Sequence, residues 1–137
     1  MDLVAGDIFY GRIPGFGIHK ARPVIVVHVT SDNKCVLVYA SSQYEKVKRR
    51  TRNQGKDVLG KLPVTYVEFN PGDADIFTET CGVNCDIVEL RKVESHLIDH
   101  HSDNPSKLKS KDKLHALIKG IKASNVVEEK VKIALDN

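Results

Sequence analysis

The first two thirds of the chain carry short apolar runs separated by turn residues. Residues 8–13 form the first run, and residues 23–29 form a β-branched run without alternation, which is typical of a strand buried on both faces. A tight turn over residues 30–34 leads directly into a third run, residues 35–40. These three runs predict strands, the second and third of them joined as an antiparallel hairpin.

Two further runs follow a stretch rich in basic residues. The basic stretch, residues 44–61, is predicted to be a long loop. Apolar positions alternate in residues 62–69, and the turn sequence of residues 70–73 ends that run. Residues 83–90 form the last apolar and β-branched run. Five strands at this spacing predict a curled sheet or a small barrel.

The last third of the chain changes its period. Apolar residues recur every three or four positions among lysines in residues 106–122, which predicts an amphipathic helix. Ser124 and Asn125 offer an N-cap for a second helix over residues 126–135. The polar residues 99–104 are predicted to be the linker between the strands and these helices.

The composition fits one compact domain, since 41% of the 137 residues are hydrophobic and 28% are charged. We therefore expect an α+β, mainly β domain, with the barrel in residues 1–97 and a helical segment in residues 98–137. The longest uncharged apolar stretch, residues 23–29, is far shorter than the roughly 20 residues that cross a bilayer. The first residues lack the basic start and apolar core of a signal peptide, so we expect a cytoplasmic protein. Three cysteines, an odd number, fit a reducing compartment.

Charge is unevenly distributed along the chain. Residues 44–61 contain seven basic and two acidic side chains, a local net charge of +5. Residues 62–90 contain six acidic side chains and no lysine or arginine. This asymmetry suggests one surface for a polyanion and another for a basic partner. A solvated loop followed by solubilising strand faces explains the same pattern equally well.

Polar side chains gather at one end of the predicted hairpin. His19, Lys20 and Arg22 stand immediately before or at the start of the second run. Three neutral polar residues, Ser41, Ser42 and Gln43, follow the third run. Because an antiparallel hairpin brings the start of one strand beside the end of the other, we expect Arg22 and Ser41 to be neighbours. Taken singly, each of these residues is more often structural, as a surface ion pair or a turn former.

An ordered set of short sequence pieces includes these residues. The pieces are Gly6-Asp7-Ile8-Phe9, Arg22-Pro23 with the β-branched residues 24–27, Ala40-Ser41-Ser42-Gln43, Leu62-Pro63 before a strand ending at Val67-Glu68, and residues 128–135. In their order and spacing they resemble the MazF/PemK-type toxins of bacterial toxin–antitoxin modules, which are sequence-selective endoribonucleases. Ser41 stands where threonine is commoner in that family, and residues 98–123, with the helix expected within residues 105–123, look like an insertion.

The resemblance implies a fold and a set of partners. The fold is an SH3-like barrel of the plasmid-toxin type with a C-terminal helix, paired into a homodimer. The activity is metal-independent cleavage of single-stranded RNA (mRNA) without a cofactor, neutralised by an antitoxin protein, with no membrane involved. Arg22 and Ser41 correspond to the family residues that face the scissile phosphate, and His19 is the nearest candidate for a histidine that some members add.

The chemistry of RNA cleavage gives these residues roles. The neighbouring 2′-hydroxyl is the nucleophile, so Arg22 would stabilise charge on the phosphorane and Ser41 would hold a phosphate oxygen. His19 would act as base or acid, because its unperturbed pKa of about 6.5 is close to working pH. The RNA strand would be bound by Lys20, Ser42, Gln43, Tyr44, Arg49, Arg50 and Arg52. A non-catalytic SH3-like barrel that binds a nucleic acid or a protein partner is the alternative.

The cysteines raise the question of a metal site. Cys81 and Cys85, with His96, His100 and His101 downstream, have a spacing that zinc can use. The spacing is not that of the usual C-x-x-C pair, so we expect free, buried thiols and no metal.

Overall fold

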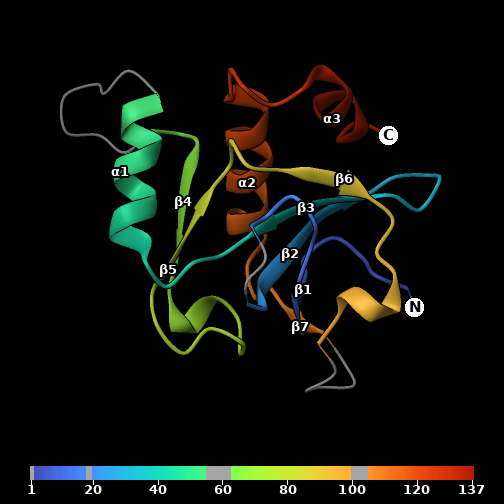
Figure 1. Cartoon of the computed structure of the whole chain (residues 1–137), viewed down its shortest axis with the longest axis horizontal. Coiled ribbons are helices and arrows are strands. Elements are labelled where there is room, and N and C mark those ends of the chain that lie inside the picture. The colour runs from blue at the N-terminus through green and yellow to red at the C-terminus, as the bar shows by residue number, and fades with distance from the viewer. Residues whose placement is uncertain (1, 18–19, 55–62, 100–104) are drawn as a thin grey trace.

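The structure is a computed structural model that describes residues 2–17, 20–54, 63–99 and 105–137, and it is α+β, mainly β (Figure 1). An antiparallel sheet of five strands has the order β6-β3-β2-β1-β7, and a separate antiparallel pair contains β4 and β5. The strands are β1 (Asp7–Gly11), β2 (Arg22–Val29), β3 (Cys35–Tyr39), β4 (Tyr66–Phe69), β5 (Cys81–Asn84), β6 (Glu89–Arg91) and β7 (Ser106–Lys107). The helices are α1 (Tyr44–Gln54), α2 (Lys111–Ala123) and α3 (Glu129–Ala134), with short 3-10 turns at Pro71–Asp73 and Ser95–Leu97. In the described part of the chain, no helix is long and apolar enough to cross a bilayer.

Strand β2 lies at the centre of the core, as its apolar sequence predicted. Residues 24–27 are at most 1% exposed. Ile25 and Val27 belong to the cluster that contains Leu117 and Ile121 of α2, whereas the alternate residues of the strand pack with Phe9 and Leu97 on the other face. Because both faces are covered, the start of β2 has a fixed position, and so do the side chains it carries.

The two sheets meet without closing into a barrel. Beyond the end of β3, the Ser41 amide donates to the Gly82 carbonyl at 3.0 Å, and the Gly82 amide donates to the Ser41 carbonyl at 2.9 Å. Among the residues that the structure describes, no closed barrel is found, so the sequence prediction holds only as a small, mainly β domain with C-terminal helices.

The last apolar run is two strands, and the prediction of a single strand over residues 83–90 is wrong. The Asn84 side-chain oxygen accepts a hydrogen bond from the Asp86 amide at 2.9 Å, and the Ile87 amide donates to the Asn84 carbonyl at 3.1 Å. This turn is typical of asparagine, and it breaks the run. Strand β5 therefore pairs with β4, whereas β6 pairs with β3 in the other sheet.

The prediction of a loop over residues 44–61 is also wrong for its first part. Tyr44–Gln54 is helix α1, which packs against β4 and β5 (Figure 1); residues 55–62 are outside the described residues. Among the described side chains of this helix, Tyr44, Val47, Lys48 and Thr51 are buried or half-buried, and of these four Val47 alone is aliphatic. The Thr51 hydroxyl donates to the Val47 carbonyl at 2.7 Å. Lysine and arginine are good helix formers, so helix formation here did not need a regular apolar stripe.

Two predicted boundaries also move. Strand β4 begins at Tyr66, because the Tyr66 amide donates to the Pro63 carbonyl at 3.0 Å in a turn that precedes it. Helix α2 begins at Lys111, five residues later than predicted. The Ser110 side chain caps it by accepting from the Asp112 amide at 3.1 Å. The preceding residues Ser106–Lys107 are instead strand β7, which pairs with β1.

The final helix is shorter than its predicted range. The Ser124 hydroxyl accepts hydrogen bonds from the Val126 and Val127 amides at 3.2 and 3.3 Å. Ser124 therefore stabilises a turn and is not the N-cap of α3, which is Glu128.

Candidate functional site

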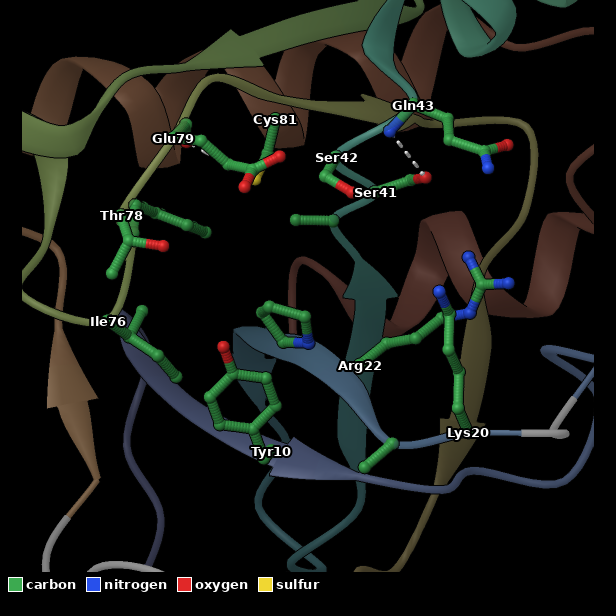
Figure 2. Close-up of a pocket in the computed structure, with 14 residues that line it drawn as sticks. Tyr10, Lys20, Arg22, Ser41, Ser42, Gln43, Ile76, Thr78, Glu79 and Cys81 are labelled. Carbon is green, nitrogen blue, oxygen red and sulfur yellow. Dashed lines mark hydrogen bonds between the residues drawn. The ribbon is translucent and has the colours of Figure 1, made fainter.

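A pocket of about 240 Å³ opens where the start of β2 and the end of β3 meet the connection between β4 and β5 (Figure 2). The strand ends contribute a polar and basic wall that consists of Lys20, Arg22, Ser41, Ser42 and Gln43. The opposite wall comes from residues 76–79 and Cys81, and Tyr10 of β1 also lines the pocket.

Strand register brings the basic wall together. Gly11 of β1 is paired with Arg22, and Val24 of β2 is paired with Tyr39 of β3. The Ala40 amide donates to the Pro23 carbonyl at 2.9 Å, so the pairing continues to the ends of both strands. As the hairpin predicted, Arg22 and Ser41 lie at the same end of the sheet and line the same pocket.

Among the described residues, Arg22 contacts an aromatic ring and forms no ion pair with an acid. Its guanidinium carbon lies 4.9 Å from the ring centroid of Tyr39, whose ring is packed against Phe16 at a centroid distance of 4.9 Å. The Nε atom of Arg22 is buried and has no hydrogen-bond partner among the described residues. Leaving a buried charged donor unpaired raises the free energy of the protein, so this nitrogen favours an acceptor from a ligand.

Ser41 is fixed by its backbone and keeps its hydroxyl proton available. Its amide and carbonyl pair with Gly82, and its hydroxyl oxygen accepts from the Gln43 amide at 3.2 Å (Figure 2). The hydroxyl can still donate, because a serine hydroxyl is both a donor and an acceptor. Lys20 lies on the same side of the pocket as Arg22 (Figure 2). This wall can therefore offer several donors to one anion.

The opposite wall was missed by the sequence analysis. It contains Ile76, Thr78, Glu79 and Cys81, of which Glu79 is exposed and Cys81 is buried. Burial, and then the charge of Glu79, raise the pKa of the Cys81 thiol. Tyr10 was missed as well. Its place opposite Pro23 in the β1–β2 register was the signal that could have found it.

The remaining residues predicted to bind RNA lie on α1, and Tyr44, Arg49 and Arg50 do not line the pocket. Arg49 and Arg50 are exposed, and Tyr44 is half-buried at the start of the helix. Arg52 belongs to the same helix, but its side chain is outside the described residues. Their position immediately after Gln43 makes α1 a continuation of the polar wall.

Lys48 of α1 has a different environment. It lies 3.8 Å from Glu45 and 3.7 Å from Glu68, and its ammonium lies over the rings of Tyr44 and Tyr66. Burial and a hydrogen bond to Glu68 raise the pKa of Tyr66, so its hydroxyl stays protonated. Lys48 therefore connects α1 to β4 through Glu68 and Tyr66, and we assign it a structural role.

Two predictions fall partly or wholly outside the described residues. His19, predicted as base or acid, lies outside these residues. So do His100 and His101, two of the possible zinc ligands. Within the described part of the chain, no group of three or more histidines, cysteines or acids could hold a metal. Cys81 and Cys85 are buried free thiols, and burial with the nearby Asp86 raises the pKa of Cys85 to about 12.

Comparisons with family models and with curated protein sequences find no match for this chain. The functional argument therefore depends on the geometry of the pocket and on the motifs of the sequence.

Proposed function

We propose that this protein is a metal-independent endoribonuclease of the MazF/PemK toxin type, with the SH3-like fold of that family, which cleaves single-stranded RNA. The observation that carries this proposal is that Arg22 and Ser41 line one pocket, where the Nε atom of Arg22 is buried and has no hydrogen-bond partner among the described residues. A half-buried guanidinium with an unused donor is suited to a phosphate, because its donors match two phosphate oxygens.

The proposed reaction uses the RNA's own 2′-hydroxyl. Its oxygen attacks the adjacent phosphorus, the bond from phosphorus to the 5′-oxygen breaks, and the products are a 2′,3′-cyclic phosphate and a 5′-hydroxyl. Arg22 donates to the oxygens on which charge develops, and the Ser41 hydroxyl donates to a phosphate oxygen. One proton leaves the 2′-hydroxyl and one reaches the 5′-oxygen, and His19 is the candidate for these transfers.

The RNA strand would extend from the pocket along α1. Lys20, Ser42 and Gln43 surround the phosphate, and the exposed cations of α1 attract the neighbouring phosphates. In this proposal the enzyme is a cytoplasmic homodimer, and an antitoxin protein inhibits it by covering Arg22 and Ser41 with an acidic or apolar segment.

A cleavage assay with mapped ends tests the proposal. Purified protein is incubated with a long single-stranded RNA in EDTA, and Arg22→Ala protein purified in the same way controls for contaminating ribonucleases. We expect cuts that leave 2′,3′-cyclic phosphate and 5′-hydroxyl ends, and almost none with the variant. RNA binding without cleavage would contradict the proposal and favour the non-catalytic alternative.

A further inference from the structure

Glu79 is an acidic residue in a pocket that we assign to a polyanion. Thr78 and Glu79 lie on the wall across from Arg22 and Lys20, and the Glu79 carboxylate is directed into the cavity (Figure 2). Glu79 is exposed, and among the residues that the structure describes its carboxylate has no ion pair or hydrogen bond. Its charge repels a phosphate on its own wall, so the pocket favours a ligand that places its phosphate at Arg22 and hydrogen-bond donors at Glu79.

The four RNA bases differ in what they offer to a carboxylate. An ionised carboxylate only accepts hydrogen bonds, and it accepts two at once from adjacent donors. Guanine presents two adjacent donors, N1–H and the N2 amino group. Adenine and cytosine place one amino group beside an acceptor nitrogen, and uracil has a single N–H between two carbonyls. Guanine is thus the only one of the four that can satisfy both oxygens of Glu79 from its Watson–Crick edge.

The rest of the pocket fits one base. The Thr78 hydroxyl points into the cavity, where it can donate to the O6 carbonyl of guanine (Figure 2). Tyr10 and Ile76 supply aromatic and apolar surface, which proteins commonly use to hold an unstacked RNA base. The volume of about 240 Å³ is below the range of about 300–1,000 Å³ that is typical for drug-sized ligands, so it suits a single base.

We propose that the pocket selects guanine, with the phosphate at Arg22 and Ser41 and the base edge at Glu79. The inference rests on the proposed function, because it takes the ligand at Arg22 to be an RNA nucleotide. It goes further by naming the substrate: the enzyme cuts RNA at a position fixed relative to a guanosine.

Binding of single nucleotides tests the pocket independently of cleavage. The 3′-monophosphates of guanosine, inosine, adenosine, cytidine and uridine are titrated and followed by amide chemical shifts. Inosine lacks only the N2 amino group of guanosine, so we expect it to bind about tenfold more weakly or worse, as for loss of one hydrogen bond to a charged group. Glu79→Gln should bring guanosine monophosphate to the inosine level. Asp75→Asn is the matched control, since Asp75 is an exposed acid in the same connection that pairs with Lys109 and does not line the pocket.

Cleavage of a randomised RNA pool gives the second measurement. We expect guanine at one fixed position of every site cut by the wild-type protein, and loss of that preference with Glu79→Gln but not with Asp75→Asn. Cleavage without guanine preference, or equal binding of guanosine and inosine monophosphates, would overturn this inference and leave the proposed function standing. A slower Glu79→Gln enzyme with unchanged base preference would overturn it too, because it would assign Glu79 to proton transfer. If the wild-type protein cuts no RNA, the proposed function fails, and the nucleotide titration still decides whether the pocket selects guanine.

Discussion

Arg22 and the arginines of α1 carry the same charge, but the protein holds them in different ways. Arg22 is half-buried at the start of a core strand and lies against Tyr39, and its Nε has no partner among the described residues. Arg49 and Arg50 extend from a surface helix into water. A charge that is fixed and partly shielded from water acts strongly on one atom, whereas exposed charges add a long-range attraction that salt screens. We therefore assign chemistry to Arg22 and attraction of the RNA strand to α1.

The largest expected effect is the loss of Arg22. Arg22→Ala should lower the cleavage rate about 10²- to 10³-fold, because it removes a preorganised donor to the developing charge. The loss should persist at saturating RNA and change little with salt. Arg12→Ala is the matched control, since Arg12 follows β1, is exposed and does not line the pocket. Equal activity of the two variants would show that Arg22 has no special role.

Gly82 tests whether the pocket and α1 depend on the same packing contact, because it bridges to Ser41 and lies against Tyr44. A Cβ at this position would lie 2.8 Å from the Tyr66 ring carbon Cε1 and 3.1 Å from the Cβ of Tyr44. Gly82→Ala should therefore destabilise the protein by about 1–3 kcal/mol in urea unfolding. At Gly72 a Cβ would meet nothing within 4 Å, so Gly72→Ala is the control and should be close to neutral. If the two variants are equally stable, α1 is not closely packed on β5.

Ser41 should contribute less than Arg22. Ser41→Ala removes one hydrogen bond from a neutral hydroxyl to a charged phosphate, so we expect a cleavage rate lower by about 10- to 100-fold. Its backbone pairing with Gly82 does not need the hydroxyl, and the exposed hydrogen bond from the Gln43 amide to the hydroxyl is worth only about 1 kcal/mol, so the variant should stay folded with a slightly lower melting temperature. Ser31→Ala, in the exposed turn between β2 and β3, is the control. An unfolded Ser41→Ala protein would make Ser41 a structural residue.

The smallest effect is expected for the cations of α1. Replacing Arg49, Arg50 and Arg52 together by glutamine should flatten the log–log dependence of RNA affinity on salt by about 0.7 for each phosphate that the variant no longer neutralises. The rate at saturating RNA should not change. Lys48→Gln should leave the slope as it is, because Lys48 is engaged with Glu45 and Glu68. An unchanged slope in the triple variant would make α1 a solvated surface only.

The two regions also differ in how well the sequence predicted them. The apolar run of β2 and the short turn after it were sufficient to place Arg22 beside Ser41, because hairpin pairing is local. The prediction of a loop fails at helix α1, because Val47 is the one aliphatic residue among the described inward side chains and the helix is stabilised by packing against β4 and β5. Glu79 entered the pocket through the pairing of β5 with β4 and the bridge of Gly82 to Ser41. Such long-range contacts leave no periodic signal in the sequence.

The most direct test of the central claim observes the Arg22 Nε–H itself. The RNA segment around a mapped cleavage site is prepared with deoxyribose at the nucleotide whose 2′-hydroxyl would attack, so that it binds without being cut. Nitrogen–proton spectra then follow the arginine Nε–H signals, assigned with Arg22→Ala and Arg12→Ala proteins. We predict that the Arg22 signal shifts strongly and exchanges more slowly with water, because its buried donor gains a phosphate acceptor. If only the signals of α1 shift while that of Arg22 stays in place, the phosphate binds elsewhere and the proposed active site is wrong.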